Sequence, residues 1–159
     1  MNIEGILDYS IKDKVIISLF SFKMMNDLSH VEDISKLKAD SDAGNPVAMA
    51  KYAWRMIHAD GAPLDRPGGA KLALSSANKG CAEGQFTYGF CVFNGLGAEE
   101  NQAEGVKYFK MAAEQNYGPA LQQLGDCFMG GMGVEKNEAE AEKYYQRAKA
   151  AGFNPVAAC

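Results

Sequence analysis

Small and apolar residues recur along most of the chain with the spacing of a single helical face, and the arrangement returns every 36 residues. Within each copy, these positions are separated by four, one and three residues, which places them on one side of an α-helix. Three helices are predicted in this way, with the following face residues: Ala48, Tyr52, Ala53 and Met56; Gly84, Tyr88, Gly89 and Val92; Ala120, Leu124, Gly125 and Phe128.

A second helix is predicted after each of these first helices. It also carries small and aromatic residues, which allow paired helices to approach closely and fill the space between them: Ala73 and Ala77; Phe109 and Ala113; Ala141, Tyr145 and Ala148. Gly44, Gly80 and Gly152 share one phase of the repeat, and Asn116 stands at the remaining position. Glycine and asparagine are typical of a helix end that turns into the left-handed conformation.

The two helices of each copy are joined by a glycine-containing loop. The segments GLGAEENQAE (95–104) and GMGVEKNEAE (131–140) are identical at six of ten positions. The glycines are predicted to reverse the chain through positive φ angles: Gly61, Gly95, Gly97, Gly131 and Gly133. In the first copy, Ala59 replaces the first loop glycine.

A polar residue follows each loop at the predicted start of the second helix. Asp65, Asn101 and Asn137 are good N-cap residues, whose side chains accept a hydrogen bond from an exposed backbone N–H. Glu104 and Glu140 lie three residues after the two asparagines. This spacing predicts a capping box, in which the glutamate returns a bond to the N-cap backbone.

The same loop raises the question of a phosphate-binding site, since glycine-rich loops before helices often hold phosphates. The dinucleotide fingerprint requires a third glycine where Lys136 stands, and a strand before the loop. The predicted element before the loop is a helix, and the Gly-Lys-Ser/Thr of a P-loop is absent from the sequence. The loop is therefore interpreted as a structural turn.

These elements define three units at residues 45–80, 81–116 and 117–152. Helix pairs of this kind bury their apolar faces only by stacking on one another. The predicted fold class is all-α, a right-handed α-α superhelix, or solenoid, of helix-turn-helix repeats. Residues 1–44 are predicted to form N-terminal capping helices and a half-repeat, with the half-repeat at 31–43, and residues 153–159 a C-terminal tail that begins a further unit.

The units resemble the Sel-one-like repeats, which are relatives of the tetratricopeptide repeats. The resemblance rests on Gly89, the G-x-G loop, Val134, the Asn or Asp after the loop and the alanine-rich second helix, and the clearest copy is GPALQQLGDCFMGGMGVEKNEAEAEKYYQRAKAAG. It implies a non-catalytic scaffold or adaptor for protein-protein interaction, which binds a protein or peptide partner on a concave face lined by the first helices.

Charge and hydropathy narrow the possible partners. A formal net charge of −4 argues against nucleic acid, whose binding proteins usually carry a basic surface. The apolar run VIISLFSF (15–22) is shorter than the about 20 residues that span a bilayer, and no small-residue cleavage site follows it. It is interpreted as a buried helix. The prediction is a cytoplasmic protein without membrane insertion.

The four cysteines, Cys81, Cys91, Cys127 and Cys159, include no C-x-x-C pair. Cys91 and Cys127 occupy equivalent positions and are predicted to be small core residues, with all four thiols free in a reducing compartment. Two alternatives remain: a repeat-scaffold enzyme or redox protein using Cys91 or Cys127, and a secreted protein stabilised by disulfides. The two histidines have no evident catalytic partner in the sequence, and neither a cofactor nor a metal is predicted.

The candidate binding surface follows from the helical period. By analogy with tetratricopeptide repeats, the concave face is offset from the core stripe of each first helix, and it carries more aromatic residues than core packing requires. The same residues would pack against neighbouring helices if this face were buried, and that alternative stays open. The candidate partner-binding residues are Trp54, Ile57, His58, Phe86, Phe90, Phe93, Asn94, Gln122, Asp126 and Met129.

Overall fold

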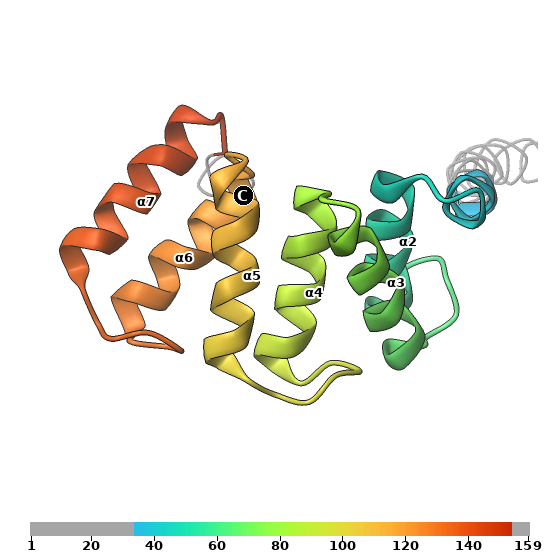
Figure 1. Cartoon of the computed structure of the whole chain (residues 1–159), viewed down its shortest axis with the longest axis horizontal. Helices are drawn as coiled ribbons and strands as arrows, with labels where there is room; N and C mark the ends of the chain where they lie inside the picture. The colour runs from blue at the N-terminus through green and yellow to red at the C-terminus, as the bar shows by residue number, and fades with distance from the viewer. Residues whose placement is uncertain (1–33, 154–159) are drawn as a thin grey trace, which may run out of the picture. The chain divides into compact units, whose positions relative to one another are not determined.

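The computed structural model describes residues 34–153 of the chain. From residue 37 onward, the described chain belongs to one compact unit. Six helices lie entirely within the described residues: α2 (Pro46–His58), α3 (Arg66–Asn78), α4 (Ala82–Asn94), α5 (Gln102–Glu114), α6 (Gly118–Gly130) and α7 (Glu138–Ala150). They follow one another in chain order (Figure 1), and residues 34–153 contain no strand.

The six helices form three equivalent pairs. Each helix has 13 residues, and corresponding helices begin 36 residues apart, at 46, 82 and 118 for the first helix of a pair and at 66, 102 and 138 for the second. The all-α repeat fold predicted from the sequence is confirmed. The predicted capping helices before residue 34, the apolar run at 15–22 and the tail after residue 153 lie outside the described residues.

Hydrogen bonds and left-handed residues set the helix ends. Asn101 and Asn137 accept bonds from Glu104 N and Glu140 N at 3.0 and 3.1 Å, and Asp65 caps α3 through Gly68 N. At the other end, Gly95 and Gly131 cap α4 and α6 with φ of 67° and 66°. The loop glycines Gly61, Gly97 and Gly133 also have positive φ. Ala59 has to adopt the same left-handed conformation, with φ of 55°.

The predicted capping boxes are wrong in one respect. The backbone N–H of Asn101 donates to Val92 O at 2.8 Å, and that of Asn137 donates to Phe128 O at 2.8 Å, so neither is available to a glutamate. Glu104 instead accepts from Lys107 Nζ at 2.9 Å. The loop is thereby tied to the last turns of the helix before it, and this longer-range bond displaces the local one.

Glycine sets how closely the helices of a pair approach. A Cβ atom on Gly105 of α5 would lie 2.9 Å from the carbonyl oxygen of Gly89 in α4, and one on Gly69 of α3 would lie 3.0 Å from Ala53 O in α2. In α6, a Cβ on Gly125 would overlap the ring of Tyr145. At least one glycine therefore stands where the two helices of each pair cross. We call this crossing the helix seam.

The loops also connect each pair to the pair before it. A Cβ atom on Gly97, in the α4–α5 loop, would overlap the carbonyl of Arg66 at the start of α3. One on Gly133, in the α6–α7 loop, would lie 2.6 Å from Gln102 O at the start of α5. Leu96 and Ala98 pack beside Ile57 and Ala70. The second loop glycine therefore serves close contact with the preceding pair as well as chain reversal.

The core runs through the stacked pairs. Phe109, Leu121 and Leu124 are fully buried in one cluster, which contains side chains from α4, α5, α6 and α7. Polar bonds join the C-terminal ends of neighbouring second helices, or the residues just after them. Gln115 Nε2 donates to Gly80 O at 3.0 Å, and Arg147 Nη2 donates to Ala113 O at 2.8 Å. Each pair is thus held to its neighbour by both apolar and polar contacts.

Candidate functional site

Four aromatic side chains, from α2, α4 and the N-cap of α6, meet on the first-helix side of the stack. Trp54 of α2 lies 5.1 Å from Phe90 and 6.2 Å from Phe86, both of α4, between ring centroids. Phe86 lies 5.6 Å from Tyr117, the N-cap residue of α6. We call these four residues the aromatic cluster. All four are half-buried, so the cluster both packs on the core and reaches the surface.

His58 and Asn94 border the cluster at the ends of α2 and α4. The His58 ring lies 4.2 Å from that of Trp54, and its Nδ1 is 2.9 Å from Trp54 O. Asn94 Nδ2 donates to Phe90 O at 2.9 Å. Both side chains are exposed. They provide a polar rim next to the exposed edges of Trp54 and Phe90.

The predicted exposure of two residues of the binding surface is wrong, because both side chains are buried. Ile57 is 1% exposed and Phe93 is 7% exposed, so neither is accessible to a partner. Ile57 packs with Ala70 and Cys91, and Leu96 of the α4–α5 loop packs against them. Phe93 packs on Phe109 with 5.6 Å between ring centroids. Helical spacing placed them beside the core stripe, but α3 and the α4–α5 loop help to bury Ile57, and α5 helps to bury Phe93.

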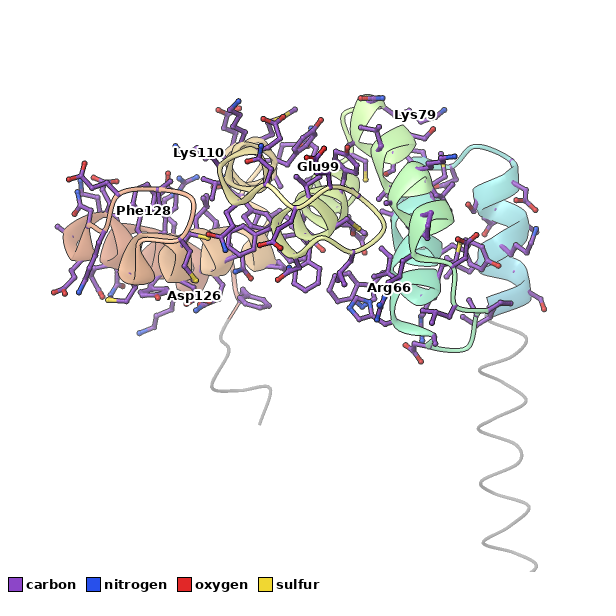
Figure 2. All side chains as sticks on the ribbon, turned by 90° about the horizontal axis from the view of Figure 1, so that it is seen from below. Arg66, Lys79, Glu99, Lys110, Asp126 and Phe128 are labelled. Carbon is purple, nitrogen blue, oxygen red and sulfur yellow. The ribbon has the colours of Figure 1, made fainter. Side chains whose placement is uncertain are left out.

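The predicted residues of α6 are two polar side chains, Gln122 and Asp126, and the apolar Met129. Asp126 is half-buried and accepts from Tyr145 Oη at 2.8 Å and from Gln122 Nε2 at 3.3 Å. Met129 is 40% exposed. In Figure 2, Asp126 lies at the opposite edge of the helix stack from Lys110, which belongs to the second helix α5. The structure thus brings Trp54, Phe86 and Phe90 together, and neither their ring contacts nor the pocket beside them includes Gln122, Asp126 or Met129.

A pocket of about 340 Å³ opens beside the aromatic cluster. Side chains from α2 and α4, together with Tyr117 and Pro119 at the start of α6, line it: Trp54, Glu83, Phe86, Thr87, Tyr117 and Pro119. Glu83 is half-buried, and the loss of solvent raises the pKa of its carboxyl, while Lys51 acts in the opposite direction. Burial, with Glu83 and Cys81 nearby, raises the pKa of Tyr117 to about 12.

Glu83 and Tyr117 were not among the predicted site residues, although the repeat alignment contains a signal for both. Tyr117 is equivalent to Asn45 and Cys81, and Glu83 is equivalent to Val47 and Pro119. Both residues therefore depart from the other copies in size or charge. Departures from an internal repeat indicate positions that the shared fold does not fix.

The alternative chemistries find little support in the described residues. Burial raises the pKa of the Cys91 thiol to about 12 and that of Cys127 to about 11, which opposes formation of the reactive thiolate. Cys81, Cys91 and Cys127 are free thiols. The backbone N–H groups of Leu96 and Met132, which a phosphate would need, donate to Cys91 O and Cys127 O. Between residues 34 and 153, no helix is long and apolar enough to cross a bilayer.

Comparison with known proteins identifies the repeats. A family model described as Sel1 repeat matches residues 46–81, 82–117 and 118–153. The crystal structure of a Sel1 repeat protein from Oxalobacter formigenes is similar, with a TM-score of 0.65 and 21% identity over 73% of this chain and 88% of that one.

A second similar structure is that of c5321, a protective antigen present in uropathogenic Escherichia coli strains that displays an SLR fold. It has a TM-score of 0.65 and 28% identity over 73% of this chain, which spans only 25% of that protein. Among curated proteins, none matches the chain.

Proposed function

The chain belongs to the Sel1 repeat family, and we propose that it is a non-catalytic adaptor that binds a protein or peptide partner along the first helices of its repeats. Members of this family are generally protein-interaction scaffolds. The single observation that carries the proposal is the aromatic cluster, which presents four half-buried rings from α2, α4 and the N-cap of α6 beside a pocket.

Aromatic residues that are partly buried before binding are suited to this role. The buried part of each side chain is already held by the core, as for Phe86, whose ring centroid lies 5.7 Å from that of Phe109. A partner that covers the remaining exposed edge therefore gains apolar burial without a large loss of side-chain freedom. The exposed His58 and Asn94 supply polar groups at the rim, as interfaces commonly do.

The proposal is tested with a displayed library of random peptides selected on the full-length protein. Peptides enriched on the wild type should lose at least about tenfold in affinity on the Trp54→Ala and Phe90→Ala variants, since interface aromatic residues commonly contribute more than 1 kcal/mol. Met111→Ala is the matched control, because Met111 is 42% exposed on the second helix α5. Equal binding by all variants would place the binding surface elsewhere.

Folding is followed separately by helical circular dichroism. Trp54 is the only tryptophan of the chain, so its emission reports directly on this surface in the unmodified protein. A peptide that binds the wild type without changing Trp54 emission would also contradict the proposed site. This readout keeps the test decisive if Trp54→Ala or Phe90→Ala unfolds.

We include the cytoplasm in the proposal, because Cys81, Cys91 and Cys127 are free thiols. Titration of the denatured chain, purified without reductant, should find all four cysteines reactive. A count of two or fewer would instead support a secreted, disulfide-stabilised protein.

A further inference from the structure

The pocket beside the aromatic cluster combines aromatic walls with one carboxylate. Phe86 contacts both other aromatic rings of the wall, with 6.2 Å to Trp54 and 5.6 Å to Tyr117 between ring centroids. The faces of aromatic rings carry partial negative charge and attract cations that approach within about 6 Å of the ring centre. Glu83, which also lines the pocket, adds a full negative charge when ionised.

Glu83 lacks a strong partner of its own. Within the described residues, its carboxylate makes neither an ion pair nor a side-chain hydrogen bond, and the charged group that acts on it is Lys51, an exposed side chain of α2. Loss of solvent destabilises a carboxylate, and a cation placed beside it offsets that cost. An incoming positive charge would therefore interact favourably with both the rings and Glu83.

The other polar groups lining the pocket do not oppose this charge, and Lys51, the cation that acts on Glu83, is exposed, so solvent screens its repulsion. Thr87 is 2% exposed, and its hydroxyl is neutral. Tyr117 is uncharged at neutral pH, since its pKa is about 12. The formal net charge of −4 also favours a basic partner over an acidic one.

We propose that this pocket binds one basic side chain, arginine or lysine, of the partner, with its aliphatic part against Trp54, Phe86 and Tyr117 and its charged end at Glu83. This inference rests on the proposed function and specifies the chemistry of the partner. A guanidinium group stacks on aromatic rings and pairs with a carboxylate in two parallel bonds, so arginine should bind more tightly than lysine.

The first experiment titrates the full-length protein with capped single residues while Trp54 emission and backbone amide NMR shifts are recorded. The probes are the N-acetyl amides of arginine, lysine, norleucine and glutamate. The arginine and lysine probes should bind at least about tenfold more tightly than norleucine, which has a similar apolar chain without the charge. The glutamate probe should bind more weakly than norleucine.

The second experiment uses matched charge variants. Glu83→Gln should weaken arginine binding about tenfold, because it removes the charge at the pocket while keeping the side-chain shape. Glu99→Gln changes the net charge by the same amount at an exposed position in the α4–α5 loop, labelled in Figure 2, and should leave the affinity unchanged. Circular dichroism and the thermal midpoint check that both variants fold.

Each outcome supports or overturns the inference. Equal binding of arginine and norleucine, or equal effects of the two glutamate variants, would identify an apolar occupant. Absence of any response to the basic probes would overturn it as well. A concentration-dependent change in Trp54 emission without a probe, with dimers in sedimentation, would indicate that a second copy fills the pocket.

The proposed function has a different point of failure. Library peptides that depend on Trp54 and Phe90 but contain no enriched basic residue would leave the adaptor proposal standing and overturn the cation pocket. Peptides that bind without Trp54 and Phe90 would overturn the adaptor site itself.

Discussion

The helix seams and the aromatic cluster are built from positions that recur in all three repeats, yet they differ in which residue types occur at those positions. At the seams, the equivalent crossing residues are Ala53 with Gly69, Gly89 with Gly105, and Gly125 with Ala141, so only glycine and alanine occur. On the cluster side, the position one residue further along reads Trp54, Phe90 and Asp126. Close helix contact therefore restricts the seam positions to small side chains. The position one residue further along has no such restriction, so its side chain differs between the repeats.

The largest effect is expected at the contact between a loop and the preceding pair. Gly97→Ala should lower the free energy of unfolding by about 2–4 kcal/mol, because a left-handed φ of 76° and an overlap with the Arg66 carbonyl add together. Gly80→Ala is the control, since Gly80 has φ of 81° but no atom within 4 Å of a built Cβ. Urea unfolding of both variants measures the difference, and equal losses would mean that the loop contact does not constrain the chain.

A seam glycine inside a helix should show a smaller effect that reverses with context. Gly125→Ala should cost about 1–3 kcal/mol, because the new methyl group overlaps the Tyr145 ring. In a Tyr145→Ala background the same change should stabilise by up to about 1 kcal/mol, since alanine is the better helix former. A double-mutant cycle on urea unfolding tests this sign change. Additive losses would show that the ring is not what excludes alanine.

Alkaline pH should weaken the buried core near Cys91 and Cys127. Burial raises their pKa values above the ordinary value of 9, to about 12 and about 11, so the thiols stay protonated in the folded chain and ionise more readily in the unfolded one. The contribution of these two thiols to the free energy of unfolding is fully present below pH 9 and is lost as the pH rises through 11 and 12. Urea unfolding in reductant at a series of pH values measures the slope.

The Cys91→Ala/Cys127→Ala double variant supplies the control for this pH effect. It should be less stable than the wild type at pH 8 but should lose less stability from there to pH 11. Tyr117 and Tyr145, whose pKa values are raised to about 12, leave a residual slope at the alkaline end. Parallel slopes in the two proteins would contradict a buried-thiol origin.

The smallest effect is expected in the α2–α3 loop, where Ala59 replaces the glycine of the other two loops. Ala59→Gly should raise the free energy of unfolding by about 0.5–1 kcal/mol, because Ala59 has φ of 55° where the equivalent residues are Gly95 and Gly131. Gly95→Ala should show a loss of similar size or larger, since its built Cβ also meets Glu100 at 3.2 Å. A destabilised Ala59→Gly variant would mean that the Ala59 methyl group contributes packing.

The helix pairs and their turns could be predicted from the sequence because the 36-residue period aligns three independent copies of the same signal. Local rules failed where a distant group competed. The predicted capping boxes do not form because the backbone N–H groups of Asn101 and Asn137 donate to carbonyl groups of the preceding helix. Ile57 was assigned to the surface because a helical period alone does not show that Leu96, from the α4–α5 loop of the next repeat, packs against it.

The candidate site was only partly predictable for a related reason. Trp54, Phe86 and Phe90 lie on helices whose phase is set by the repeat, so their meeting follows from the pattern. Glu83 and Tyr117 lie in the first turn and at the N-cap of their helices, where the chain direction rather than the helical period decides where a side chain lies. Their contribution becomes visible only when α4 and α6 are placed together.

The second loop glycines give the stack a direction. Gly97 rests on the start of α3 and Gly133 on the start of α5, so each pair docks on a surface completed by the pair before it. A ribosome releases the chain in this same order, and domains generally fold from the N-terminal end during synthesis. The loop contacts of the second and third pairs are therefore made to helices that have already been synthesised, so these contacts can form in chain order.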